Sequence, residues 1–275
     1  MKKSISLLLI LVLVFTMSTS VFAGRNNIKK IDLDQYLLEM GTPLDLVLSM
    51  NEETKSDIVN DDLSQKEKGA FSGASITRSY VEESENIDEL SYKKEFNSLG
   101  EVIYETLQKK GTIDDSDLEL TVVYYKYSDY VSVYLNYEWL NPYQPFNRYQ
   151  DPIGITWDYD YFRYMPNTFK RYDYAIDFCG DKIKRSGATL SDTHNEGLGW
   201  HADLIGPFGA YEKNYGYGKF RLEKKATSAK TEFYYKYTHV KTAAAYTINI
   251  AGYGSITIDG GSHYDTQANT TWVEY

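Results

Sequence analysis

Two of the four histidines of this chain and three carboxylates fall within the twelve positions from Asp192 to Asp203. Four of these side chains are of types that bind Zn²⁺: His194, Glu196, His201 and Asp203. A zinc hydrolase needs two or three neutral imidazoles, a carboxylate and an open coordination position for water. The helical His-Glu-x-x-His arrangement is absent, however, and Gly197 and Gly199 indicate a loop. A polar surface connection is therefore the preferred interpretation, with a metal-assisted hydrolase as the alternative.

A second group of candidate ligands surrounds the glycine pair Gly260-Gly261, at the end of a strand-like run. It consists of Asp259, His263 and Asp265. These side chains, with oxygen atoms of the turn, have the chemistry of a cation site. Glycine pairs after a strand are also ordinary turn residues, and a turn is the preferred interpretation. We therefore expect no cofactor, with zinc or calcium as the alternative at these two clusters.

Tyrosine is the compositional outlier, with 27 residues among 275. Five aromatic residues in loops or beside acids are candidates for stacking on sugar rings: Tyr143, Tyr149, Trp157, Tyr161 and Tyr164. Tyrosine combines a large apolar ring with a polar tip, which suits recognition surfaces. In strands the same residue is a favoured packing residue, and most of the rings are expected to pack there. The expected partner is a cell-wall or extracellular glycan, or a protein.

The nucleophile motif of the α/β-hydrolases is missing. The sequence contains no Gly-x-Ser-x-Gly pattern. The single cysteine, Cys179, excludes a disulfide within one chain and is expected to pack as a small hydrophobic residue in a strand. Serine and cysteine hydrolase functions are therefore disfavoured.

The elements that must position these residues are mainly strands. From Glu119 onward, apolar and polar side chains alternate with a period of two, as they do in strands with one buried face. Residues 120–127 and 130–138, and again 244–251 and 254–259, form pairs with short connections that suit hairpins. The pattern predicts a mainly β fold, an antiparallel β-sandwich or barrel-like domain, and excludes parallel α/β folds.

Residues 24–60 predict a small helical segment, because Thr42-Pro43 and Asn51 are typical helix starts. The polar stretch 61–75 predicts a linker, and 76–275 the β domain. Within that domain the pattern over 76–118 fits a helix or strands equally well, because Gly100 interrupts a helical stripe.

The first 23 residues have the pattern of a secretory signal peptide. Lys2 and Lys3 precede an apolar run, and the segment ends in small residues at Val21-Phe22-Ala23. The run is shorter than the roughly 20 residues that span a bilayer. We therefore predict cleavage after Ala23, a secreted protein, and no transmembrane anchor after cleavage. The net charge of −10 argues against nucleic acid as a partner.

Two segments carry a resemblance to known proteins: Tyr36–Lys55, with Gly41-Thr42-Pro43, and Tyr137–Trp157, with Asp151-Pro-Ile-Gly-Ile-Thr-Trp157. They resemble exported proteins of Gram-positive bacteria that have no assigned activity. The resemblance covers about a fifth of the chain. It implies export and a β domain, and it implies no site.

Three functions follow from these observations. The first is a non-enzymatic binding or interaction protein at or outside the cell envelope. The alternative is the hydrolase centred on His194 and His201. The third is a membrane-active β-hairpin toxin, because residues 243–258 alternate apolar and polar side chains around a turn. The strands of that hairpin are shorter than the roughly nine residues that a membrane-spanning strand needs.

Overall fold

A computed structural model describes residues 31–80, 90–109, 118–140, 150–177, 179–204, 211–240, 246–259 and 264–275. The predicted signal peptide lies outside these residues. In the described part of the chain, no helix has the length and apolar character needed to cross a membrane.

Three short helices open the described chain: α2 (Leu33–Glu39), α3 (Leu44–Ser49) and α4 (Glu52–Leu63). The side chains of Asp32 and Asn51 cap α2 and α4 by accepting hydrogen bonds from backbone N–H groups in the first turn. The predicted helical segment is confirmed. The connection that follows is shorter than the predicted linker 61–75, because α4 continues to Leu63 and the first strand begins at Ala70.

The strands form two large antiparallel sheets and a separate hairpin. The nine-stranded sheet has the order β3-β2-β1-β4-β5-β12-β8-β9, with β7 beside β12. Its strands are β1 (Ala70–Tyr80), β2 (Leu90–Phe96), β3 (Val102–Lys109), β4 (Leu118–Lys126), β5 (Tyr130–Trp139), β7 (Phe162–Tyr164), β8 (Lys170–Asp177), β9 (Lys182–Gly187) and β12 (Tyr211–Lys224).

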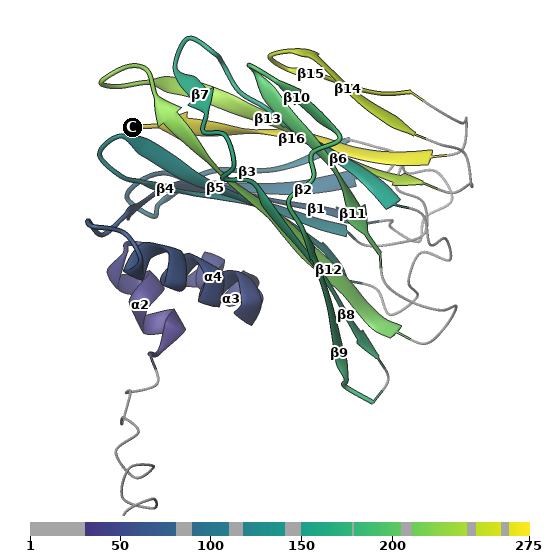
Figure 1. The fold of residues 1–275 in the computed structure, drawn as a ribbon. Helices are drawn as coiled ribbons and strands as arrows, with labels where there is room; N and C mark the ends of the chain where they lie inside the picture. The colour runs from purple at the N-terminus through teal and green to yellow at the C-terminus, as the bar shows by residue number, and fades with distance from the viewer. Residues whose placement is uncertain are drawn as a thin grey trace, which may run out of the picture.

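The five-stranded sheet has the order β10-β11-β6-β13-β16. Its strands are β6 (Gln150–Thr156), β10 (Asp192–His194), β11 (Gly197–Asp203), β13 (Lys230–Val240) and β16 (Tyr264–Glu274), and the hairpin is β14 (Thr247–Gly252) with β15 (Ser255–Asp259). Figure 1 shows the helices on one side of the nine-stranded sheet and the five-stranded sheet on the other. The predicted mainly β, antiparallel sandwich is confirmed.

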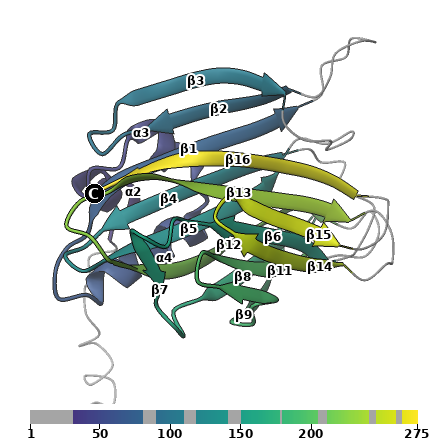
Figure 2. The ribbon, with the colours of Figure 1, turned by 90° about the horizontal axis from the view of Figure 1, so that it is seen from above.

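The described parts of the stretch 76–118 form strands and the turn between β2 and β3. β1, β2 and β3 lie side by side there, and Gly100 turns the chain between β2 and β3 with a φ of +77°. Glycine adopts this left-handed conformation without the penalty that a side chain would add. The glycine that interrupts the helical stripe therefore marks a hairpin turn. Figure 2 shows β2 and β3 extending past β16, the edge strand of the other sheet.

The main core lies between the two large sheets. Leu120, Val122, Val133 and Leu135 from the nine-stranded sheet pack there with residues such as Ile153 from the five-stranded sheet. Three of the four tryptophans are buried in this core: Trp139, Trp157 and Trp200. Alternation with a period of two places these side chains on the inner faces of both sheets.

A second core lies between the helices and the outer face of the nine-stranded sheet. Leu37, Leu46 and Val59 of the helices pack there against tyrosines of the sheet, including Tyr125 and Tyr217. Buried tyrosine hydroxyl groups need hydrogen-bond partners, and polar residues of the helical segment supply several of them. Part of the high tyrosine content is thus a packing feature of this layer.

The hairpin β14–β15 lies on the outer face of the five-stranded sheet, where three glycines receive it. A methyl group added at Gly154, Gly197 or Gly199 would come within 3.0 Å of Ile256, Ile250 or Ile248, respectively. The glycines thus open the sheet surface to the isoleucines. The expectation of a loop at Gly197 and Gly199 was wrong, because both lie in β11 and their missing side chains make room for the hairpin. The membrane-active function stays a prediction.

Cys179 also differs from its prediction. It is exposed and free in the turn after β8, which ends at Asp177. The alternating pattern that predicted a packed cysteine does not extend past the end of the strand.

Candidate functional site

The four candidate zinc ligands belong to the hairpin β10–β11 and the turn between its strands. Glu196 accepts a hydrogen bond from the backbone N–H of Tyr253, 2.6 Å away, and Asp203 pairs with Arg185 at 2.7 Å. The His201 Nδ1 lies 2.5 Å from the Ser191 hydroxyl oxygen. These side chains join neighbouring segments of the fold.

His194 and His201 do not share a coordination sphere. His194 pairs with Gly197 across the hairpin, and His201 is four residues farther along β11, roughly 13 Å away at the rise of a strand. Among the described residues, no three His, Cys, Asp or Glu side chains are grouped as metal ligands would be. Burial lowers the pKa of His201, which favours the neutral imidazole.

The second candidate cluster is divided. Asp259 is exposed at the end of β15, whereas Asp265 is buried on β16. His263 lies outside the described residues. The two described carboxylates therefore face different environments.

The predicted binding aromatics that the structure describes take part in packing. Trp157 is fully buried, and its indole N–H donates to the Asn195 carbonyl oxygen over 3.1 Å. Tyr161 and Tyr164 are half-buried against the main core. Tyr143 and Tyr149 lie outside the described residues.

The structure also contains a buried polar network that sequence patterns do not reveal. Asp151 accepts hydrogen bonds from the Tyr237 hydroxyl at 2.5 Å and from the Val240 backbone at 3.0 Å, and lies 3.0 Å from the His239 Nδ1. All three side chains, those of Asp151, Tyr237 and His239, are buried. The network resembles catalytic constellations in composition, but its burial assigns it to the contact between β6 and β13.

A second buried carboxylate links the two sheets. Asp173 accepts a hydrogen bond from the Tyr137 hydroxyl at 2.9 Å and lies 3.3 Å from Arg171, whose guanidinium donates to the His201 carbonyl oxygen. Burial raises the pKa of Asp173 to about 6, although Arg171 and Tyr137 act in the opposite direction. In this group Asp173 is buried and Arg171 is partly exposed, and the contacts join the two sheets.

Two aromatic rings that the sequence analysis did not select are exposed on the outer face of the five-stranded sheet. Trp272 of β16 and Tyr253 of the β14–β15 turn are each 44 % exposed. Glu232 of β13 pairs directly with Trp272 in the sheet, so their side chains share one face. The Tyr253 hydroxyl lies near Thr231 and Glu232, and partial burial is the main cause that raises its pKa above the ordinary value.

Lys230 completes this surface, with its Nζ 5.6 Å from the centre of the Trp272 ring. We call Lys230, Glu232, Tyr253 and Trp272 the aromatic platform. It combines two ring faces with one hydrogen-bond acceptor and one donor. Side chains alternate between buried and exposed along β16, so the pattern of the sequence is consistent with a buried Val273 and an outward Trp272. Only the fold shows that the hairpin leaves this part of the sheet uncovered.

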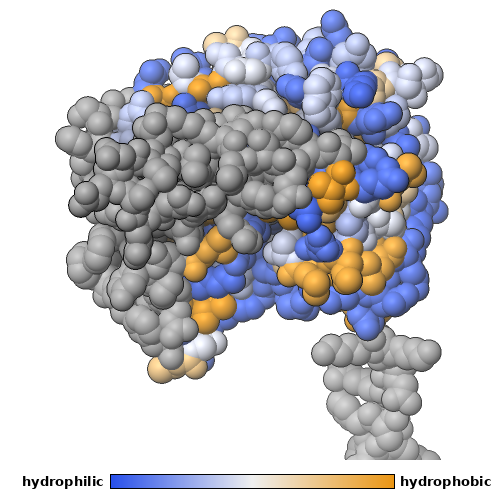
Figure 3. Space-filling view, turned by 180° about the vertical axis from the view of Figure 1, so that it is seen from behind, coloured by the Kyte–Doolittle hydropathy of each residue, from blue (hydrophilic) through white to orange (hydrophobic). Residues whose placement is uncertain are grey.

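An apolar patch lies elsewhere, on the helical layer. Its exposed members are Leu44 and Leu48 of α3 and Leu99 and Val102 at the β2–β3 turn. The two segments lie close together. A methyl group added at Gly100, in the β2–β3 turn, would lie 3.2 Å from the Pro43 ring, just before α3. Figure 3 shows apolar side chains gathered on the helix-bearing part of the face seen from behind. None of these four side chains has a polar group that could hydrogen-bond to a sugar.

Comparisons with known proteins show distant structural likeness alone. No family model matches the chain, and no curated protein matches it in sequence. Among solved structures, the C-terminal domain of the antigen I/II-family protein AspA of Streptococcus pyogenes is 11 % identical, with a TM-score of 0.30 over 67 % of this chain and 54 % of that domain. The chain thus spans about half of that solved domain.

Two further solved structures have similar scores. The C-terminal domain of the AgI/II polypeptide BspA of Streptococcus agalactiae is 10 % identical, with a TM-score of 0.31 over 74 % of this chain and 84 % of that one. Clostridium perfringens delta-toxin is 6 % identical, with a TM-score of 0.29 over 72 % of this chain and 99 % of that one. These scores are too low to assign the chain to any of these families.

Proposed function

We propose that this protein is an exported, non-enzymatic binding protein and that its aromatic platform binds a glycan. The observation that carries the proposal is the exposure of Trp272 and Tyr253 on either side of Glu232, on one face of the five-stranded sheet. Export is supported by the signal-peptide pattern of residues 1–23.

The chemistry of the platform suits pyranose rings. The C–H face of a sugar packs against the face of an aromatic ring, and its hydroxyl groups form hydrogen bonds at the ring edge. Glu232 accepts such hydrogen bonds, and Lys230 donates them. Covering two exposed rings also removes apolar surface from water, which contributes about 25 cal/mol per Å².

The platform is prepared for binding before a ligand arrives. Trp272 stands on a strand that is paired with β13 along its whole length. The turn that carries Tyr253 is held by the hydrogen bond from its backbone N–H to Glu196. Rings fixed in this way lose little conformational entropy on binding, which favours affinity.

Native affinity electrophoresis tests the proposal. The folded protein is run through gels containing glycol chitin, xylan, mannan or pullulan, and at least one polysaccharide is expected to slow its migration. Trp272→Ala should weaken this retardation roughly fivefold or more, as expected for the loss of one stacking contact. Tyr264→Ala is the matched control, because Tyr264 is also exposed but lies at the opposite end of β16.

Unchanged migration of the folded wild type in every gel would contradict glycan binding by this protein. Equal retardation of Trp272→Ala and wild type would place glycan binding outside the platform.

A further inference from the structure

A cleft lies between α4 and the outer face of the nine-stranded sheet, on the opposite side of the sandwich from the aromatic platform. Its volume is about 180 Å³. That is roughly six times the volume of ~30 Å³ that one water molecule occupies in the liquid. The cleft therefore has room for a small ion with a substituent.

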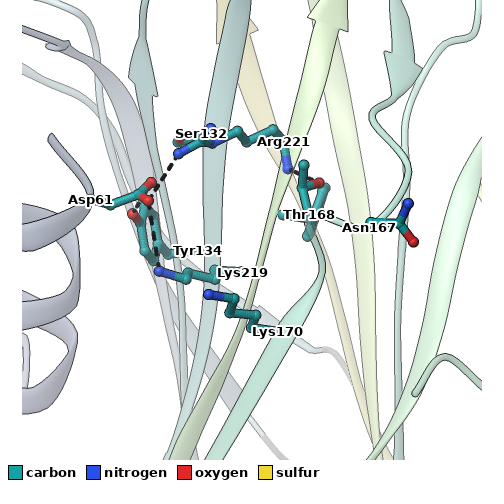
Figure 4. Close-up of a pocket in the computed structure, with 9 residues that line it drawn as sticks. Asp61, Ser132, Tyr134, Asn167, Thr168, Lys170, Lys219 and Arg221 are labelled. Atoms are coloured by element: carbon teal, nitrogen blue, oxygen red, sulfur yellow. Dashed lines mark hydrogen bonds and ion pairs between the residues drawn. The ribbon is translucent and has the colours of Figure 1, made fainter. Parts of the chain in front are cut away.

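The register of two strands places three cationic side chains together on the floor of this cleft. Lys219 of β12 pairs directly with Lys170 of β8, and Arg221 follows two residues later on the same face of β12. Figure 4 shows these side chains around the cleft, with Asp61 of α4 opposite them. Like charges directly opposite each other across two strands are destabilising unless an anion lies nearby.

The helix neutralises this group only in part. Asp57 lies 2.6 Å from Lys219, and Asp61 lies 2.9 Å from Arg221. For Lys170, no carboxylate partner is present in the described part of the chain. Three cations thus face two carboxylates, in a chain whose net charge is −10.

A buried hydroxyl group in the cleft provides an independent observation. Ser132 pairs with Arg221 across β5 and β12, lines the cleft and is only 3 % exposed. Its Oγ has no hydrogen-bond partner in the described structure. A buried hydroxyl group without a partner costs free energy, so a ligand that accepts a hydrogen bond from it would relieve that cost.

We infer that this cleft binds a tetrahedral oxyanion, a phosphate or sulfate group, through Lys170, Lys219, Arg221 and the Ser132 hydroxyl. The anion is free in solution or is carried by a small sugar. Charge-assisted hydrogen bonds from lysine and arginine are the strongest that proteins offer to such groups. Asp61 limits the affinity, because it repels the anion while it holds Arg221.

Isothermal titration calorimetry with inorganic phosphate and with sulfate tests the inference. The ionic strength is kept constant with sodium chloride. Saturable binding is expected, and Lys170→Ala should weaken it about tenfold, as for one charge-assisted hydrogen bond. Lys170 is exposed, so this variant should fold. Ser132→Ala, which removes a hydroxyl that has no partner, should weaken binding without loss of stability.

Matched controls separate this site from general charge effects and from the aromatic platform. Lys66→Ala removes an exposed lysine beyond the end of α4 and should leave the affinity unchanged. Trp272→Ala should also leave it unchanged. Asp61→Asn should strengthen binding severalfold, because a competing negative charge is removed.

Glucose 1-phosphate distinguishes the two sources of the anion. Tighter binding than that of inorganic phosphate supports an anion carried by a sugar, and equal or weaker binding supports a free anion. Absence of saturable binding of phosphate and sulfate by the folded protein would overturn the inference. Wild-type affinity in both Lys170→Ala and Ser132→Ala would overturn it as well.

Discussion

The two large sheets cover their outer faces in different ways. The helical segment covers the nine-stranded sheet with polar contacts as well as apolar ones: Thr42 contacts Tyr125, and Thr54 donates to Asn136. The hairpin covers the five-stranded sheet through isoleucines placed on glycines. Polar contacts between layers need defined partners and leave the cleft beside Asp61, whereas the apolar contact closes tightly and leaves the aromatic platform beyond its edge.

The largest loss of stability is predicted for substitution of Asp62, near the end of α4. This buried carboxylate accepts hydrogen bonds from the Tyr127 hydroxyl at 2.7 Å, the Tyr36 hydroxyl at 2.8 Å and the Gly69 N–H at 2.6 Å. Asp62→Ala leaves three donors without an acceptor and should lower the free energy of unfolding by about 4 kcal/mol. Urea denaturation measures this change.

Asp62→Asn serves as the control for shape. It keeps an acceptor oxygen but loses the charge, so its loss should be roughly half as large. A loss below about 1 kcal/mol for Asp62→Ala would show that the helical layer is held by its apolar contacts instead.

A smaller loss of stability is predicted where the hairpin β14–β15 packs on the five-stranded sheet. The methyl group of Gly199→Ala would lie 2.7 Å from Ile248, too close without movement of the hairpin. Overpacking of this kind should lower the free energy of unfolding by about 2 kcal/mol. Gly187→Ala is the matched control, because its methyl group meets the Arg171 side chain at an ordinary 3.4 Å.

Thermal denaturation of the two glycine variants makes the comparison. Gly187→Ala should be close to wild type in its midpoint, whereas Gly199→Ala should melt several degrees lower. Equal midpoints for the two variants would contradict a hairpin packed on the glycines.

The smallest predicted effect is a pH dependence confined to the helical layer. Burial raises the pKa of Glu53, but hydrogen bonds from Lys182 and Tyr215 outweigh burial, and the net result is a pKa below the ordinary value of 4.5. The folded state therefore binds this proton less readily than the unfolded state. The stabilisation is complete above about pH 4.5 and is lost as the pH falls through the lowered pKa.

Glu53→Gln should flatten the acid limb of the stability profile between pH 3 and pH 5. Urea midpoints over this range measure the change. An acid limb as steep in Glu53→Gln as in the wild type would show that other carboxylates cause it.

Sequence patterns predicted those parts of the fold that depend on neighbours along the chain. Alternation identified β4, β5 and the hairpin β14–β15, and helix starts such as Asn51 identified the helices, but β11 was expected to be a loop. They did not identify the role of Gly197 and Gly199, because a glycine that allows a turn and a glycine that receives a side chain look the same in sequence. The difference lies in Ile248 and Ile250, about 50 residues away.

The candidate sites were harder to predict than the fold for the same reason. Trp157 directly follows β6 and Trp272 stands in β16, and side chains alternate in both stretches of sequence. Only Trp157 was selected as a binding residue, because acids neighbour it in the sequence. Packing decides between them: Phe220 lies against Trp157, with ring centres 5.7 Å apart, whereas Trp272 faces outward past the hairpin. Exposure is set by how layers are stacked, which a single sequence does not encode locally.

The four tryptophan indole N–H signals provide the most direct test of glycan binding at the platform. Trp139, Trp157 and Trp200 are buried, and Trp272 is exposed. Oligosaccharides from the polysaccharide that slows migration most are titrated into ¹⁵N-labelled protein, with the Trp272 signal assigned from Trp272→Phe. We predict that the Trp272 signal shifts saturably while the other three stay fixed. A fixed Trp272 signal at saturating oligosaccharide would contradict the proposed binding face.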